Sequence, residues 1–427
     1  MAVDLRESIY IIMPVTGLIL QFKQSVGLVD PDDPIPGSFD FVPMINGRMF
    51  QGPLLVGNPT SFAIFETKDG SFVTASGLYP HLYHGILNVF GVQPDGAAIA
   101  AAIKTWNAED LDDAMAKAGM AFAIHRTAEE WAAHPEAQHL AKTPLIEIVK
   151  AADGDPVAWT GDPAAPLSGL KVLTNTHVIA GSTAGRALSE YGADVMHIAR
   201  DQSFEHELIW TDINIGMRLR FLDLRKAGQK ARMQGLTPQA DVFIESFRAR
   251  SMERLGFGVE EMSKGHKGIV YLSMRCYSWD GPWSGRASFD MEALTTSGFT
   301  VTEGRDGKPR FPATMVLNDY IAGYLGAAGI IAALRRRASE GGSYHVRVNL
   351  TRAAMWYASL GTFETMEFDT SDPDHQMISP RTIRGQTPYG EVHRLAPQAV
   401  LSATPGQWPD QLLHVRGTNL PEWRNRT

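Results

Sequence analysis

The stretch Leu167–Arg200, LSGLKVLTNTHVIAGSTAGRALSEYGADVMHIAR, decides the fold of this chain. Lys171–Leu173 lies in a short apolar run, which predicts a buried strand. A loop of mostly small residues at Val178–Gly185 and a helix at Arg186–Tyr191 follow, and Val195–Ile198 predicts a second strand. Strand, turn, helix and strand form a βαβ unit, which is typical of a parallel, nucleotide-binding sheet.

The turn after the first strand lacks the usual dinucleotide fingerprint, because Gly181 and Gly185 do not form G-x-G-x-x-G. The second strand ends at Ala199–Arg200, where an NAD site would place an acidic residue on the ribose. An arginine there suits a phosphate instead. These residues leave two interpretations: a site for a nucleotide with an additional phosphate, or an ordinary α/β core with a surface arginine.

Three phrases in this stretch, L-x-G-x-x-V-L, T-H-V-x-A-G and L-x-x-x-G-A-D-V, occur in an order that resembles the class III CoA-transferases. That family includes formyl-CoA transferase, carnitine CoA-transferases and α-methylacyl-CoA racemase. The resemblance continues through Asp241–Gly258, Ser288–Gly298 and Leu317–Leu334. It implies an α/β fold: an open, mostly parallel Rossmann-like sheet domain with a smaller α+β domain.

Composition is that of an ordinary globular enzyme with two or three domains: 427 residues, 44% hydrophobic and 20% charged. The formal net charge of −8 argues against a nucleic-acid partner. The single cysteine, Cys276, allows no internal disulfide, so we expect a reducing cytoplasm. The N-terminus lacks a signal-peptide pattern, and the apolar run Ile9–Phe22 is too short to span a bilayer. We therefore expect no membrane partner.

The first part of the chain contains a strong hairpin signal, two alternating strands in Ser61–Ser76 with Lys68-Asp69-Gly70 at the turn. Helical stretches follow at Leu82–Phe90, Gly96–Trp106, Ala108–Gly119 and Thr127–Ala133. This pattern resembles the small domain that the family normally carries in its C-terminal half. Residues 3–10 also resemble residues 348–355, which begin a large-domain helix.

The family's domain order therefore looks rearranged in this chain. We predict an N-terminal helix fragment and connector at 1–57, a small α+β domain at 58–150, a Pro- and Gly-rich linker at 151–166, a large CoA-binding α/β domain at 167–375 and a C-terminal tail at 376–427. Descent from a tandem duplication, a chance match and a truncated N-terminus are the open explanations.

Asp319 stands at the start of a long apolar helix, in Leu317-Asn318-Asp319-Tyr320. The residues alone allow a helix cap or a buried catalytic carboxylate. The resemblance implies the second role, in which Asp319 attacks a thioester, forms an acyl-aspartyl anhydride and then an aspartyl-CoA thioester. A desolvated carboxylate held against the thioester carbonyl can perform this attack.

The resemblance also implies the CoA contacts. They are His177, Val178, Ile179 and Ala180 in the small-residue loop, Arg200 at the strand end, and Arg218, Phe247, Arg254 and Phe289 further along the chain. Two departures put the phosphate contacts in question: Met217 replaces a lysine, and Ser246 stands where the family usually has Asn. Taken alone, each of the arginines also fits a solvated surface charge.

Phe289 separates the branches of the family. In the racemase branch a histidine at this position forms half of an acid–base pair with a carboxylate, and phenylalanine cannot move a proton. Asp290 beside it fits either a pocket lining or a helix cap.

These observations predict a CoA-transferase that moves CoA between an acyl-CoA donor and a carboxylic acid acceptor. The alternatives are an acyl-CoA racemase or isomerase and a non-catalytic CoA-binding paralogue. Coenzyme A enters as a substrate thioester, and we predict no metal, because the sequence shows no His, Cys and carboxylate cluster at ligand spacing. The resemblance implies an interlocked homodimer, and a second, different subunit is the alternative.

Overall fold

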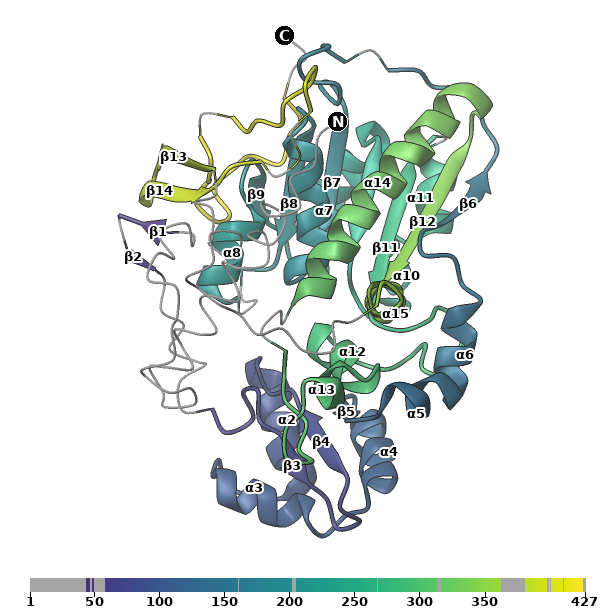
Figure 1. Ribbon diagram of the computed structural model, residues 1–427. Coiled ribbons are helices and arrows are strands. Elements are labelled where there is room, and N and C mark those ends of the chain that lie inside the picture. Colours follow the sequence, from purple (N-terminus) through teal and green to yellow (C-terminus); the bar gives the residue numbers. More distant parts are fainter. Residues whose placement is uncertain are drawn as a thin grey trace, which may run out of the picture.

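The computed structural model describes residues 44–46, 48–49, 58–159, 161–201, 205–266, 268–312, 316–361, 381–397, 399, 401–409 and 411–424. The apolar run at 9–22 and most of the predicted connector at 1–57 lie outside these residues. A large sheet with helices on both faces forms one half of the molecule, and a small α+β unit packs at one end of it (Figure 1).

The large sheet has seven strands in the order β6-β12-β11-β10-β7-β8-β9. Their bounds are Glu147–Ala152 for β6, Ser343–Asn349 for β12, Val270–Arg275 for β11, Val242–Glu245 for β10, Lys171–Asn175 for β7, Asp194–Ala199 for β8 and Arg218–Phe221 for β9. Only the edge strand β6 runs antiparallel to its neighbour. The predicted fold class is therefore confirmed.

Strand order reverses between β7 and β10. From β7 the chain continues outward through β8 and β9, whereas β10, β11 and β12 are added on the other side. Ligands of open α/β sheets bind at such a reversal, outside the carboxyl ends of the strands.

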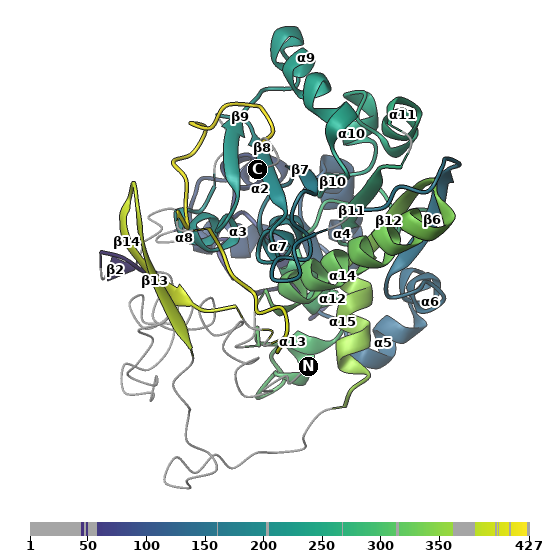
Figure 2. The ribbon, with the colours of Figure 1, turned by 90° about the horizontal axis from the view of Figure 1, so that it is seen from above.

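Helices cover both faces of this sheet. They are α7 (Ile179–Ser189), α8 (Glu207–Ile213), α9 (Ala227–Leu236), α10 (Ser251–Arg254), α11 (Val259–Gly265), α14 (Leu317–Glu340) and α15 (Leu350–Ala358). Two further helices, α12 (Asp290–Thr296) and α13 (Phe299–Thr302), lie at the end of the sheet beside the small unit (Figure 1). Figure 2 shows α7 and α14 on one face and α9, α10 and α11 on the other. By length and composition α14 could cross a membrane, but 67% of its most apolar window is buried inside the protein, as in a core helix.

The predicted loop at Val178–Gly185 is wrong, because this segment forms most of α7. Every residue of the helix is buried. A Cβ at Gly181 would meet Thr176 and Ser246, and one at Gly185 would meet Met217 and Thr174. The small residues that indicated a loop instead let the helix approach the sheet closely, so tertiary packing outweighs their low helix propensity.

The same kind of approach joins α7 to α14. An added Cβ at Gly323 would lie 2.6 Å from Thr183 and 2.9 Å from the Ala180 carbonyl oxygen. One at Gly326 would lie 2.9 Å from Leu272. The absent side chains bring the first turns of the two helices together beside the switch point of the sheet.

The small unit contains the predicted hairpin. β3 (Phe65–Glu66) and β4 (Phe72–Ala75) pair antiparallel, and β5 (Phe122–Ile124) adds to β4. Its helices are α2 (Pro80–Phe90), α3 (Gly96–Ile103) and α4 (Ala108–Ala118), and α5 (Ala128–Ala133) and α6 (Pro135–Ala141) lead to the large sheet. Strand β6 of that sheet crosses the domain boundary predicted at residue 150.

A third, four-stranded sheet has the order β13-β14-β1-β2, with β13 at Thr382–Thr387, β14 at Gly390–Leu395, β1 at Met44–Ile45 and β2 at Arg48–Met49. After it the chain returns along the large domain. The Asn419 N–H donates to the Leu219 carbonyl at 3.1 Å, and the Trp423 indole donates to the Leu236 carbonyl at 3.1 Å.

We predict that Gly323→Ala lowers the free energy of unfolding by about 1–3 kcal/mol, because the new methyl group overpacks the contact between α7 and α14. Urea denaturation measures the change. Gly228→Ala in α9 is the matched control, since nothing lies within 4 Å of its Cβ position, and it should be neutral or stabilising by up to about 1 kcal/mol. Equal effects of the two substitutions would contradict the close packing.

Candidate active site

A cavity of about 410 Å³ lies at the carboxyl edge of the parallel strands, on both sides of the switch point. The segments after β7, β8, β9, β10 and β11 line it with Thr176, His177, Arg200, Leu224, Ser246, Phe247, Arg248, Arg275 and Tyr277. His81 from the small unit and Phe289 complete the wall. The cavity therefore lies where the topology places a ligand.

Arginines dominate the charge of this cavity. Arg225 is paired with Asp223 at 2.7 Å, and Arg286 with Asp112 at 2.6 Å. Three further lining arginines, Arg200, Arg248 and Arg275, form no ion pair with the described residues. Arg248 is exposed at the cavity, although partial burial still lowers the pKa of its guanidinium. Such groups suit the phosphates of a nucleotide.

Ser246 joins the two halves of the sheet at the switch point. Its hydroxyl accepts a hydrogen bond from the His177 N–H at 3.0 Å and donates one to the His177 carbonyl at 3.2 Å. The hydroxyl thus satisfies the backbone of the residue that precedes α7. The change from the family's usual Asn leaves a side chain that positions the loop.

The predicted CoA contacts divide into three groups. His177, Arg200, Phe247 and Phe289 line the cavity. Val178 caps α7 with a φ of 61°, and Ile179 and Ala180 form its first turn, where Ile179 packs beneath the helix with Ile213 and Tyr320.

The structure does not bring Arg218 and Arg254 to the cavity. Arg218 begins β9, at the amino-terminal ends of the parallel strands and away from the cavity. There its Nη2 pairs with Asp194 at 2.9 Å and its Nη1 donates to the Glu422 carbonyl. Arg254 is exposed on α10, and its guanidinium reaches Ser251. Arg218 therefore holds the C-terminal segment, and the resemblance did not show this because its partners lie far away in the sequence.

Sequence reasoning missed Arg248 and Arg275 as cavity residues. Arg248 follows β10 by three residues, and Arg275 ends β11. The rule that ligands bind at the carboxyl ends of parallel strands would have indicated both.

Asp319 lies in the first turn of α14 and is 7% exposed. The helix has Val316 as its N-cap and no side-chain cap bond, so Asp319 does not cap it. No hydrogen bond or ion pair to the Asp319 carboxylate is present among the described residues. Burial, together with the charge of Asp290, raises the pKa of Asp319 well above its ordinary value.

Two further polar side chains beside Asp319 are buried without hydrogen bonds. Neither oxygen of Asp290, which is 1% exposed, and neither polar atom of the fully buried Asn318 amide has a partner of good geometry. Burial raises the pKa of Asp290 to about 7, although the Asn318 side chain and the Val316 N–H offset part of the rise. Buried groups left unpaired in this way are costly, and a polar substrate group would satisfy them.

Glu292 is the third carboxyl of this region, and its bonds are complete. It accepts hydrogen bonds from the Phe289 N–H at 2.8 Å and from the Ser76 hydroxyl of the small unit. Burial raises its pKa to about 7. Glu292 therefore fixes Phe289 and ties the small unit to the large domain.

Tyr79 of the small unit closes the region from above. Its ring stacks on Phe289 with centroids 5.5 Å apart, and it lies 4.8 Å from the His177 ring and 5.3 Å from the His206 ring. Burial and the charges of Glu205 and Asp319 raise the pKa of the Tyr79 phenol. Tyr79 thus contacts two residues that line the cavity, Phe289 and His177, and lies close enough to Asp319 to feel its charge, so the small unit contributes to the surroundings of this carboxylate.

No group of three or more His, Cys, Asp or Glu side chains that could hold a metal ion is present in the described part of the chain. Cys276 is buried, and burial raises the pKa of its thiol, which disfavours a reactive thiolate.

The sequence matches the family described as CoA-transferase family III over residues 167–410, which is more than half of the chain. The chain belongs to this family, as the resemblance predicted.

Curated relatives include an acetyl-coenzyme A transferase of Hypoxylon pulicicidum, 30% identical over 328 residues that cover 70% of this chain and 55% of the relative. The alpha subunit of succinyl-CoA–L-malate CoA-transferase of Chloroflexus aurantiacus is 29% identical over 241 residues, 53% of this chain and 54% of the relative. A crystal structure of Rv3272 from Mycobacterium tuberculosis, 29% identical, covers 47% of this chain and 57% of that chain with a TM-score of 0.44. The chain spans about half the length of the curated relatives it matches.

We predict that Glu292→Gln flattens the pH dependence of stability. The folded pKa of Glu292, about 7, exceeds its ordinary value of 4.5, so this group favours folding below about pH 4.5 and loses that contribution as pH rises toward 7. The loss is worth about 3 kcal/mol. Gln can accept from the Phe289 N–H and donate to Ser76, so the contacts persist without titration. Urea unfolding between pH 4.5 and 7.5 measures both slopes, and identical slopes would contradict this origin.

Proposed function

We propose that this chain catalyses transfer of CoA from an acyl-CoA donor to a carboxylic acid acceptor, with Asp319 as the nucleophile. The observation that carries the proposal is the Asp319 carboxyl itself, which is buried and unpartnered among the described residues, in the first turn of the helix that packs closely on α7. Asp319 is not one of the residues that line the cavity. Membership of CoA-transferase family III and relatives named as CoA-transferases support it.

The cavity supplies the binding part of the reaction. Arg200, Arg248 and Arg275 would hold the phosphates of CoA, and the apolar Phe247 and Leu224 would contact the less polar parts of the cofactor. The thioester end would extend toward Phe289 and Tyr79, whose rings are stacked. Tyr79 lies close enough to Asp319 for its charge to raise the pKa of the phenol. Fixing the phosphates far from the reacting carbon lets binding energy position the thioester.

The Asp319 carboxylate attacks the thioester carbonyl, the C–S bond breaks, and CoA leaves as a thiolate. The thiolate attacks the aspartyl carbonyl of the resulting anhydride, which releases the donor acid as a carboxylate and leaves an aspartyl-CoA thioester. The acceptor carboxylate repeats these steps in reverse and departs as its CoA thioester.

The environment of Asp319 explains how a carboxylate can act as this nucleophile. Burial and Asp290 raise its pKa, and a carboxylate of higher pKa is a stronger nucleophile once it is ionised. The racemase alternative needs the histidine of the family's acid–base pair, but Phe289 stands at that place in the sequence and cannot move a proton.

Intact-protein mass spectrometry after incubation with acetyl-CoA, succinyl-CoA or other acyl-CoAs tests the proposal. We predict a hydroxylamine-sensitive covalent adduct on the parent protein and none on Asp319→Asn. Glu303→Gln, which removes an exposed acid outside the site, is the control and should keep the adduct. Bound CoA without any adduct would favour the non-catalytic alternative, and an adduct that persists in Asp319→Asn would exclude this nucleophile.

The pH dependence of adduct formation provides a second prediction. The rate should rise with pH as Asp319 loses its proton. Removing the Asp290 charge in Asp290→Asn lowers the pKa of Asp319, so the half-maximal rate should move to lower pH. Rapid-quench mass spectrometry over pH 5–9 measures the shift, with Glu303→Gln as control. An unchanged midpoint in Asp290→Asn would show that the two carboxyls do not interact.

A further inference from the structure

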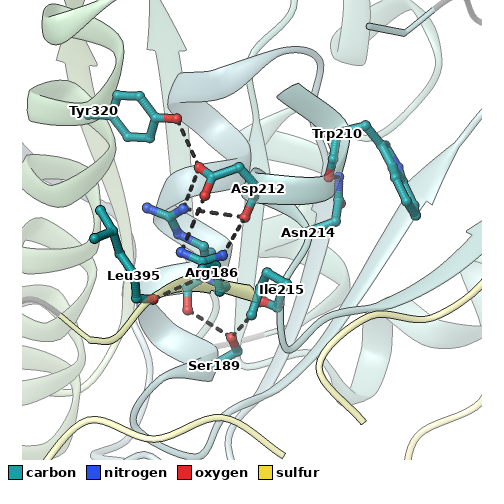
Figure 3. Close-up of polar contacts among 9 residues, drawn as sticks. Arg186, Ser189, Trp210, Asp212, Asn214, Ile215, Tyr320 and Leu395 are labelled. Carbon is teal, nitrogen blue, oxygen red and sulfur yellow. Dashed lines mark hydrogen bonds and ion pairs between the residues drawn. The ribbon is translucent and has the colours of Figure 1, made fainter. Parts of the chain in front are cut away.

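Behind the first turn of α14, a buried polar cluster joins segments that lie far apart in the sequence (Figure 3). Asp212 of α8 is its centre, and Arg186 of α7 and Arg394 of β14 are its cations. The three side chains are 10%, 4% and 5% exposed. None of them lines the cavity, so the proposed binding of CoA leaves the cluster unexplained.

Both arginines grip Asp212 through its side chain and its backbone. Arg186 donates to the Asp212 carboxylate at 2.7 Å and to the Asp212 carbonyl at 3.3 Å. Arg394 lies 3.3 Å from the other carboxylate oxygen and donates to the same carbonyl at 3.1 Å. The Arg394 guanidinium also lies over the Trp408 ring, 4.7 Å from its centroid. Arg394 therefore connects the C-terminal segment to α8, beside the packing of Trp210 on Tyr389 and Val392.

The Asp212 carboxylate has a third donor. The Tyr320 hydroxyl donates to the oxygen that Arg186 also contacts, at 2.9 Å. Burial acts to raise the pKa of Asp212, but the charges of Arg186 and Arg394 outweigh burial and hold the pKa below its ordinary value. The carboxylate stays ionised, so it remains a strong acceptor for the tyrosine.

Tyr320 is the residue after Asp319, in the first turn of α14, and it packs with Ile179 and Ile213. The turn starts at Val316, whose φ of 65° is unusual for a β-branched residue, and no side chain caps the helix. The side chains of Asn318 and Asp319 make no hydrogen bond of good geometry within the described chain. Strained backbone of this kind persists only where its surroundings constrain it. The hydrogen bond from Tyr320 to Asp212 is the side-chain anchor of this turn.

We propose that Arg394 is a positioning residue for the reaction: it completes the clamp on Asp212 that holds Tyr320, and through Tyr320 the orientation of Asp319. The C-terminal hairpin is then part of the catalytic apparatus without touching substrate. The proposal rests on the function proposed above and assigns to this segment the control of reaction rate, as distinct from CoA affinity.

Single-turnover adduct formation at saturating acyl-CoA, together with the Kd for CoA, tests this role in Arg394→Met, Arg394→Lys and Tyr320→Phe. We expect the adduct to form roughly tenfold more slowly or worse in Arg394→Met and in Tyr320→Phe. The Kd for CoA should stay within about twofold, because the cavity residues are unchanged. Arg394→Lys should recover part of the rate. The double variant Arg394→Met/Tyr320→Phe should be no slower than the slower single variant, since both break one chain of contacts.

Arg384→Met is the matched control. Arg384 lies in the same hairpin, where it pairs with Glu391 on the surface and is 62% exposed. Its loss should change neither the rate nor the Kd. Equal rates in Arg394→Met, Tyr320→Phe and Arg384→Met would overturn the positioning role, and so would multiplicative effects in the double variant.

Hydrogen–deuterium exchange without substrate separates this inference from the function on which it rests. Peptides that cover the first turn of α14 should exchange faster in Arg394→Met and in Tyr320→Phe than in the parent and Arg384→Met. If the parent forms no adduct, the proposed function fails. The hydrogen–deuterium exchange of the first turn of α14 then tests by itself whether the contact between Tyr320 and Asp212 holds this turn. If Asp319-dependent adducts form but exchange of this turn is the same in all variants, the function stands and the anchor is wrong.

Discussion

The close contact between α7 and α14 is the constraint on which the site depends. A helix axis can approach another this closely only where side chains are absent, and Gly323 meets Thr183 and the Ala180 carbonyl across the contact. The contact places the first turn of α14 beside the first turn of α7, which itself begins at the switch point of the sheet. An aspartate in that turn, Asp319, is thereby held out of water, and the proposed function requires the thioester of the ligand to reach it.

The site separates its charges. The cavity carries three arginines, Arg200, Arg248 and Arg275, with no carboxylate partner among the described residues, whereas Asp319, Asp290 and Glu292 are buried and do not line it. Cations beside Asp319 would lower its pKa and weaken it as a nucleophile. In the proposed function, this separation keeps the charges that would bind phosphate away from the carboxylate that would attack the thioester.

Much of this arrangement could be predicted from the sequence, because it is encoded locally. Apolar runs marked the strands, the turn Lys68-Asp69-Gly70 marked the hairpin, and the family phrases identified the helix of Asp319. The helix α7 was missed because its small residues serve a packing contact that only the folded chain defines. The roles of Tyr79 and Arg394 could not be predicted from the sequence for a related reason. Each contacts its partners only after segments far apart in the chain have packed together. Arg218 was assigned to CoA by family position, although its geometry makes it an anchor for the C-terminal segment.

In the proposed mechanism, the Asp319 carboxylate exchanges an oxygen with the acceptor acid in every catalytic cycle. Succinyl-CoA with ¹⁸O-labelled succinate, followed by peptide mass spectrometry, tests this claim most directly, and acetyl-CoA with labelled acetate extends it. Thiolate attack on the acceptor carbonyl of the mixed anhydride leaves one acceptor oxygen on the aspartate. We therefore predict ¹⁸O in the peptide that contains Asp319 and in no other. If turnover occurs but the label is absent from that peptide, or is found in a different one, Asp319 is not the nucleophile.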